Sequence, residues 1–171
     1  MQSSGFTLSI ILDMPPKAQK ETQFANGHAY TPAEKVNYML KASKKLRPYR
    51  RKFKGNKFLA IKFIFVCPRP KACPEDLKHI KGMWKNQIRF YKPSRPDLDN
   101  YEKVIQDCLS LHVIRKVKNK AGESIMSHKG AGVVDDDSYF VKKLSIKVYA
   151  KIGEEPHIKI KIKALDPIYE S

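Results

Sequence analysis

The sequence predicts an α/β fold of the α+β type, in which a small mixed β-sheet packs with two to three α-helices. Two patterns predict it: stretches in which apolar and polar residues alternate, as in strands, and stretches with apolar residues at helical spacing. With 171 residues, the chain is long enough to bury a core without disulfide or metal crosslinks. We therefore expect a single domain over residues 1–171.

The first predicted elements are a strand, a basic loop and a helix. Residues 6–12 alternate between apolar and polar side chains, and residues 15–30 predict a basic loop or loose hairpin. The run from Thr31 to Glu34 is typical of a helix start, with threonine as the cap and proline in the first turn. We expect this helix to end near Pro48. Its expected buried residues are Val36, Met39, Leu40, Ser43 and Leu46.

The middle of the chain predicts the central strand and a second long helix. Residues 58–66 are aromatic and β-branched throughout, which is typical of a core strand. Residues 74–85 predict a short helix, in which we expect Trp84 to pack rather than to stack on a base. From Asp99 to Leu111 the apolar residues recur at helical spacing. They are Tyr101, Val104, Ile105, Cys108 and Leu109.

The last third predicts a loop followed by two strands. Residues 112–132 contain three glycines and several basic residues, which predicts a flexible basic loop. Residues 139–150 and 157–164 alternate between apolar and polar side chains, and we expect them to pair as an antiparallel hairpin. Isoleucines of the second strand would face the core, whereas its lysines would face solvent.

The charge of the chain indicates a polyanionic partner. Lysine and arginine number 34 against 17 acidic residues, a net charge of +17. Nucleic acid is the leading candidate. A membrane surface is the alternative, but the chain has no apolar run near 18 residues and no basic amphipathic helix with an aromatic face.

The cysteines and the N-terminus favour a cytoplasmic protein. The three cysteines form neither a CxxC pair nor an even framework, and we interpret them as reduced thiols. The histidines have no zinc-ligand spacing relative to them. Residues 1–12 have no basic region before their apolar stretch, so we expect no signal peptide.

Two acidic clusters interrupt this basic chain. Prolines hold the segment before Asp97 and Asp99 extended, so both carboxylates would point to one side, and Lys103 follows one helical turn after Asp99. The second cluster is Asp135–Asp137. Carboxylates about 4 Å apart repel by roughly 4 kcal/mol at an effective dielectric constant near 20, so converging carboxylates need a cation or a proton.

Each cluster also has a structural explanation. Asp99 with Glu102 three residues later could form a capping box, and the triplet could be a polar turn. Neither explanation accounts for two clusters with a lysine beside one of them. Phosphodiester cleavage needs charge neutralisation and a nucleophile at neutral pH, and Mg²⁺ held by a few carboxylates provides both. The combination therefore favours a metal-dependent nuclease.

The residues around both clusters resemble the RusA family of Holliday junction resolvases, known from bacteria and their prophages. The resemblance rests on Arg95-Pro96-Asp97-Leu98-Asp99-Asn100 with Lys103 and Asp107, and on Val134-Asp135-Asp136-Asp137-Ser138 followed by a strand. The stretch from Pro15 to Pro32 also looks like the family's N-terminal loop and helix start. The stretch between the two motifs is longer than expected for the family.

The resemblance implies a homodimer that makes paired nicks across a four-way DNA junction with Mg²⁺, or Mn²⁺ in its place, in DNA recombination and repair. Asp97 and Asp99 match the first two catalytic carboxylates of the family and Lys103 matches its catalytic lysine. An ungapped match through Ser138 selects Asp137 as the third carboxylate, with Asp136 as its neighbour. The expected metal ligands are Asp97, Asp99, Asp136 and Asp137.

Basic residues outside these motifs are expected to contact DNA, because each neutralised phosphate releases counterions. The expected contacts are Lys17, Lys20, Lys44, Lys45, Arg47, Arg50, Arg51, Lys52, Arg95, Arg115, Lys116 and Lys118. The alternative is a nucleic-acid-binding protein without catalysis. That alternative predicts a steep salt dependence of binding but no nicking and no response to Mg²⁺.

Overall fold

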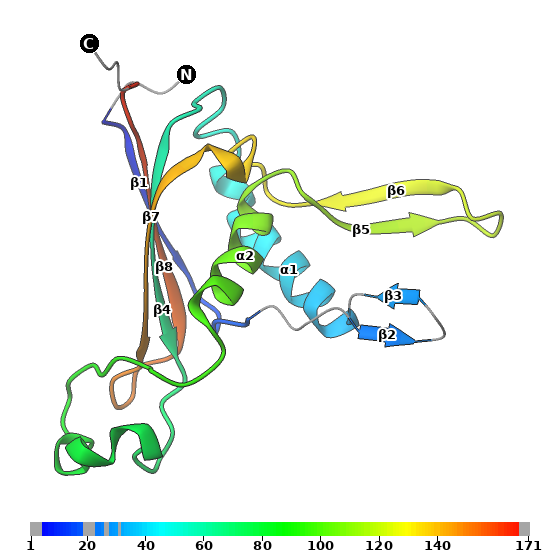
Figure 1. Cartoon of the computed structure of the whole chain (residues 1–171). Helices are drawn as coiled ribbons and strands as arrows, with labels where there is room; N and C mark the ends of the chain where they lie inside the picture. Colours follow the sequence, from blue (N-terminus) through cyan, green and yellow to red (C-terminus); the bar gives the residue numbers. More distant parts are fainter. Residues whose placement is uncertain (1–4, 19–22, 26–27, 31, 168–171) are drawn as a thin grey trace.

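The computed structural model describes residues 5–18, 23–25, 28–30 and 32–167. A four-stranded sheet forms one side of the molecule, and two α-helices cover one face of it (Figure 1). Two hairpins extend from the helical side, away from the sheet. The predicted α+β class is confirmed. None of the described helices is long and apolar enough to cross a membrane.

The strand order in the sheet is β1-β8-β4-β7. These strands are β1 (Thr7–Leu12), β4 (Leu59–Cys67), β7 (Phe140–Tyr149) and β8 (His157–Ala164). Strand β4 pairs antiparallel with β8 and parallel with β7. As the most apolar strand, β4 takes an interior position, where both of its edges are hydrogen-bonded and six of its nine residues are buried.

The expected hairpin between the last two strands is wrong. Strands β7 and β8 both form, and residues 151–156 do connect them, but β4 lies between them in the sheet. Strand alternation shows which side of a strand is buried and does not identify its neighbour. The expected faces are correct for β8, in which Ile158, Ile160 and Ile162 are buried and the intervening lysines are exposed.

Helices α1 (Ala33–Leu46) and α2 (Leu98–Leu109) pack against the sheet and against each other. The expected apolar face of α2 is buried throughout. Helix α1 buries Met39, Ser43 and Leu46 as expected, together with Ala42, whereas Val36 and Leu40 are only partly buried. Pro32 occupies its N-cap position and a short 3₁₀ helix, η1 (Arg47–Tyr49), follows its end. The expected cap, Thr31, lies outside the described residues.

The short helix expected near Trp84 is a kinked 3₁₀ helix, η2 (Glu75–Met83), with a non-helical residue at Ile80. It belongs to a small lobe with its own apolar cluster of Leu77, Trp84, Phe90 and Tyr149. The Arg69 guanidinium lies 4.1 Å from the Trp84 ring centroid. Trp84 is therefore a packing residue, as expected.

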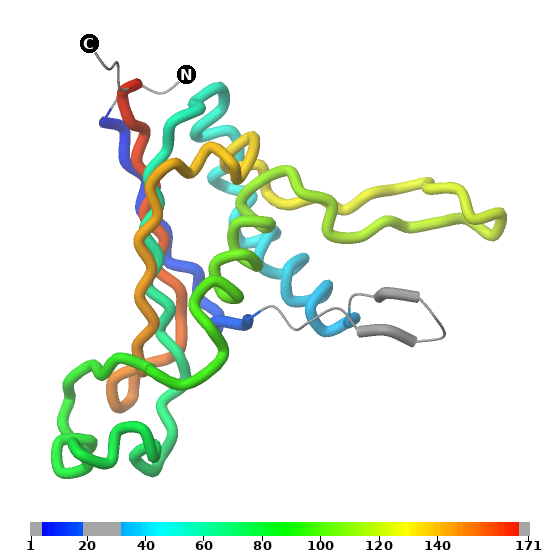
Figure 2. The backbone as a smooth tube through the Cα atoms, in the orientation of Figure 1, coloured from blue at the N-terminus to red at the C-terminus, as the bar shows by residue number. Residues whose placement is uncertain are grey.

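The two hairpins differ from the sequence expectation to different degrees. Strands β2 (Gln23–Ala25) and β3 (His28–Tyr30) form the loose hairpin expected before α1. The flexible loop expected over residues 112–132 is instead a second hairpin, of β5 (Val113–Lys118) and β6 (Ser124–Lys129). Figure 2 shows it as a long arm. Its strands bury almost nothing, so the apolar alternation that reveals a strand in a sequence is absent.

Candidate active site

Two lysines hold the segment that precedes α2, residues 94–96, through hydrogen bonds to its backbone carbonyl groups. Lys92 Nζ donates hydrogen bonds to the carbonyl oxygens of Ser94 (2.9 Å) and Arg95 (2.6 Å). Lys147 Nζ, from β7, donates to the carbonyl oxygens of Ser94 and Pro96, both at 2.8 Å. Burial lowers the pKa of Lys92, and the nearby charge of Lys147 lowers it further. The segment that leads into Asp97 is therefore fixed to the sheet.

We expected the two aspartates of the first motif to lie on one extended segment, and this prediction is wrong. Asp97 is the N-cap residue with an extended backbone, and the helix begins at Leu98, so Asp99 lies in the first helical turn. The Asp97 side chain makes no capping hydrogen bond, and Asp99 Oδ1 accepts one from the backbone N–H of Asn100 (2.9 Å). The capping box considered as the alternative explanation for Asp99 and Glu102 is therefore not formed.

A short segment after β6, residues 130–134, which we call the strap, brings the second acidic cluster back to α2. After β6, the N–H of Ala131 donates to the carbonyl of Cys108 (2.7 Å), and the N–H of Val133 donates to that of Leu109 (2.8 Å). These bonds satisfy carbonyl groups that the end of a helix leaves without partners. A Cβ atom at Gly130 would lie 2.2 Å from the Ser110 carbonyl oxygen, so only glycine permits this approach.

Each aspartate of the triplet has a different environment. Asp135 Oδ2 accepts a hydrogen bond from the N–H of Gly55 (2.8 Å), and Asp136 Oδ1 accepts one from the N–H of Ser138 (2.8 Å). The hydrogen bonds with Ser138 lower the pKa of Asp136. Asp137, at the start of the 3₁₀ helix η3 (Asp137–Tyr139), directs Oδ2 to 3.5 Å from Lys103 Nζ. Within the described residues, Asp137 is thus the aspartate of the triplet that forms an ion pair with α2.

Lys103 joins the two halves of the site. Its Nζ atom lies 3.0 Å from Asp107 Oδ1 and 3.5 Å from Asp137 Oδ2. The Asp107 side chain is only 8% exposed, whereas that of Lys103 is 52% exposed. The hydrogen bond and the charge of Asp107, with a contribution from Asp137, raise the pKa of Lys103. Lys103 is therefore protonated at neutral pH and lies at the surface between two carboxylates.

An open hollow of about 370 Å³ lies beside this lysine, between α2 and the edge strand β7. Lys143, from β7, donates a hydrogen bond to Gln106 Oε1 (3.2 Å) at its wall. The hollow is lined by Asp99, Asn100, Glu102, Lys103, Gln106 and Lys143. Carboxylates and ammonium groups thus share one surface depression, an arrangement that suits a cation together with a phosphate.

The donor chemistry fits a hard divalent ion, because carboxylate oxygens are the ligands that such ions prefer. The expected ligands are only partly brought together. Asp99 lines the hollow and Asp137 reaches its lysine, whereas Asp97 is exposed at the helix start and Asp136 caps η3. Over the described part of the chain, no three acidic, histidine or cysteine side chains gather closely enough to hold an ion.

Three residues of the site, Glu102, Gln106 and Lys143, were not expected from the sequence, and they line the hollow. Asp107 belongs to the motif that carries the family resemblance but had no expected role, and it pairs with Lys103. The i, i+4 spacing of Lys103 and Asp107 is a readable signal for the pair. Lys143 could have been inferred only from the polar residues that alternate along β7, because its position depends on α2 covering that strand.

The basic residues expected to contact DNA lie at several places. Lys44, Lys45, Arg47, Arg50, Arg51 and Lys52 are exposed at and beyond the end of α1, Arg95 is exposed before α2, and Arg115, Lys116 and Lys118 are exposed on β5. Lys17 forms an ion pair with Glu34. Lys20 lies outside the described residues.

The family model described as endodeoxyribonuclease RusA matches residues 13–118, more than half of the chain. The match includes Asp97, Asp99 and Lys103 and ends with β5, so β6 and the aspartate triplet lie beyond it. Comparison with curated proteins gives no match.

Proposed function

The chain belongs to the RusA endodeoxyribonuclease family, and on that premise we propose that it is a metal-dependent, structure-selective endonuclease that resolves Holliday junctions by paired nicks. The observation that carries the proposal is the contact between Lys103 and Asp137. It joins a lysine inside the family match to an aspartate beyond it, across a hairpin that separates them by 34 residues. The two acidic clusters therefore serve one site in this proposal.

The proposed metal ligands are Asp97, Asp99 and Asp137, with Asp136 assisting. A bound Mg²⁺ or Mn²⁺ ion would neutralise charge on the scissile phosphate and lower the pKa of a bound water. Lys103 would contact the phosphate and stabilise the charge that develops on it. Asp107 would hold the Lys103 ammonium in place, since it is the nearer and more buried of the two carboxylates.

The proposed substrate is branched DNA, and the proposed protein is a homodimer in a single domain per chain. Paired nicks require two sites, which a symmetric dimer supplies. The exposed basic residues after α1 and on β5 would bind the phosphates of the junction arms. We place this activity in the cytoplasm of a bacterium, encoded by the bacterium or by a phage.

The proposal is tested by incubating the purified protein with Mg²⁺ and a synthetic four-way junction, beside three-way and linear DNA. We expect paired nicks in the four-way junction. Asp97→Asn, Asp99→Asn, Asp137→Asn and Lys103→Ala should each reduce the cleavage rate at least about 100-fold, as expected when transition-state charge loses its stabilisation. Asp13→Asn, at an exposed aspartate before α1, is the matched control and should cleave like the parent.

Two results would contradict the proposal. Equal cleavage by Asp99→Asn and the parent would remove the assigned site. Junction binding without nicking by the parent, at any Mg²⁺ or Mn²⁺ concentration, would favour the non-catalytic nucleic-acid-binding protein instead.

A further inference from the structure

The face of the sheet opposite the helices carries a cluster of lysines. The register places side chains of β1, β8, β4 and β7 side by side on this outer face. In one row Ser9, Lys161, Lys62 and Leu144 are neighbours. We call the lysines of this face the outer lysine cluster; its members are Lys62, Lys142, Lys159, Lys161 and Lys163.

The outer lysine cluster has no acidic neighbours on its own face. The residues that point outward from the four strands include no aspartate or glutamate. Within the described residues, none of the five lysines takes part in an ion pair. A sheet face whose lysines only interact with water could also carry acidic residues, and these would reduce the repulsion between the lysines. The face is thus a concentrated positive surface.

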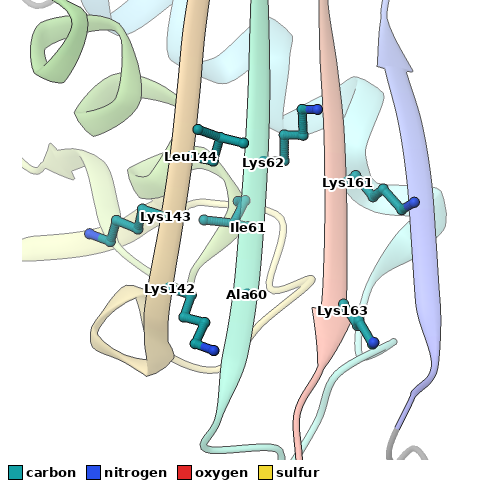
Figure 3. Close-up of a pocket in the computed structure, with 8 residues that line it drawn as sticks. All are labelled: Ala60, Ile61, Lys62, Lys142, Lys143, Leu144, Lys161 and Lys163. Carbon is teal, nitrogen blue, oxygen red and sulfur yellow. The ribbon is translucent and has the colours of Figure 1, made fainter.

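This surface is continuous with the candidate active site. A hollow of about 500 Å³ on the outer face is lined by lysines of three neighbouring strands (Figure 3). Lys143 lines this hollow and also the hollow beside Asp99 and Lys103. In Figure 3 its side chain extends from β7 away from the rest of the sheet. Because β7 is the edge strand, its residues Lys143 and Lys142 connect the hollow beside Lys103 with the outer face around this edge of the sheet.

We propose that the DNA arm that leaves the cleavage site crosses the β7 edge and binds its phosphates to Lys62, Lys142, Lys161 and Lys163 on the outer sheet face. This inference rests on the proposed function and adds the path of one arm. Duplex DNA carries one negative charge per about 1.7 Å of its axis. Lysines two residues apart on one strand are separated by about 6.6 Å, and those on adjacent strands by about 4.8 Å, so several can contact one backbone.

A second copy of the chain fits this part of the face poorly. A symmetric contact would place two sets of lysines against each other without an acidic residue to compensate them. The exposed apolar residues Ile11 (68% exposed) and Leu144 (53% exposed) lie on the two opposite edge strands, β1 and β7, and Lys62 and Lys161 occupy the row of Leu144 on the two strands between them. Charge complementarity therefore favours a polyanion as the occupant.

The test compares the salt dependence of junction binding for two triple variants with the same loss of charge. The outer-face variant is Lys62→Gln/Lys161→Gln/Lys163→Gln. The control variant is Lys71→Gln/Lys81→Gln/Lys85→Gln, three exposed lysines in and around the η2 lobe. The slope of log K against log salt concentration is negative, and each lost phosphate contact reduces its magnitude by about 0.9. For the outer-face variant we expect the magnitude of this slope to fall by about 2 to 3. The control variant should keep the parental slope.

The outcomes separate this inference from the proposed function. Unchanged melting temperatures show that both variants fold. If the parent binds and cleaves junctions and both variants have the same slope, the path over the outer face is wrong and the nuclease proposal stands. If the outer-face variant changes only the dimerisation of the protein, measured by sedimentation, the face binds a second copy and the inference is overturned. If the parent neither binds nor cleaves a junction, both proposals fail.

Discussion

Lys103 compensates a carboxylate that the fold places almost entirely out of contact with water. Asp107 lies on the buried side of α2 with its side chain 8% exposed, and its Oδ1 atom is 3.0 Å from the lysine ammonium. An unpaired buried carboxylate costs much more than a paired one, because its lost hydration is not replaced. The same ammonium also faces Asp137. At the scale of single residues, one lysine thus supports the helix and the proposed site.

Replacing Lys103 with Met should destabilise the fold as well as the activity. The variant leaves the Asp107 carboxylate without its counter-ion, and we expect a loss of about 1–3 kcal/mol in the free energy of unfolding. Urea unfolding measures it. Lys103→Met/Asp107→Asn is the control, since it also removes the buried charge and should recover part of the loss. A double variant as unstable as Lys103→Met would contradict this account.

The cysteines should differ sharply in reactivity. Burial raises the pKa of Cys108 to about 12 and also raises the pKa of Cys67. The thiolate is the reactive form, so the folded protein suppresses it in both residues over the pH range where a free thiol ionises. Cys73 is partly exposed. At pH 8 we expect a thiol reagent to label Cys73 alone, and all three cysteines after denaturation; rapid labelling of Cys108 in the folded protein would contradict this.

At the scale of elements, the strap after β6 decides how the acidic clusters meet. It crosses the end of α2 by backbone hydrogen bonds to Cys108 and Leu109, and the N–H groups of Arg51 and Phe53 bond to its other side. The strap is thus held between α2 and the segment after α1. The direction in which Asp137 leaves it is a consequence of this double attachment.

Gly130→Ala should be strongly destabilising. The added Cβ would meet backbone oxygens of Ser110 at 2.2 Å and Asp107 at 2.4 Å, and neither can move without breaking the end of α2. We expect a loss of about 2–3 kcal/mol in chemical unfolding, at the upper end for overpacking. Gly82→Ala is the control, because its Cβ would meet nothing within 4 Å. Similar unfolding midpoints for the two variants would show that the strap adjusts freely.

The arm formed by β5 and β6 should contribute to DNA binding and little to stability. Its basic side chains are exposed and its strands bury almost nothing. We expect Arg115→Gln/Lys116→Gln/Lys118→Gln to keep the parental melting temperature. For junction binding, the magnitude of the slope of log K against log salt concentration should fall by about 2 to 3. The triple variant at Lys71, Lys81 and Lys85 again serves as the control. A parental slope would remove the arm from the proposed DNA surface.

At the scale of the whole molecule, the distribution of charge is uneven in a way that matches the proposed function. The chain has a net charge of +17, and exposed basic residues lie on the outer sheet face, in the segment after α1, on the β5–β6 arm and in and around the η2 lobe. The aspartates at the start of α2 and after the strap interrupt it. A divalent cation would be attracted to those aspartates and repelled elsewhere.

Mg²⁺ should therefore raise the thermal stability of the protein through this site. A ligand that binds only the folded state at about 100 times its dissociation constant adds about 2.7 kcal/mol to the free energy of unfolding. We expect a rise in melting temperature for the parent and for Asp13→Asn, and a smaller rise for Asp99→Asn and Asp137→Asn. An equal rise for Asp137→Asn would remove this aspartate from the set of proposed ligands.

Local patterns in the sequence were sufficient for much of this structure. The period of two in β8 predicted which isoleucines are buried, and the helical spacing in α2 predicted its whole apolar face. The motif around Asp97, Asp99 and Lys103 predicted the family and the helix that carries its residues. The β5–β6 arm was missed because its strands have no buried side and hence no apolar alternation.

The sequence by itself determined which side of each core element is buried and which short motif belongs to the family, because both depend on residues close together in the chain. The tertiary structure alone decided that β4 lies between β7 and β8 and that Asp137 faces Lys103 while Gly55 and Ser138 bind its two neighbours. Strand order and side-chain direction at the strap depend on contacts between distant segments. Such contacts are settled only when the whole chain packs.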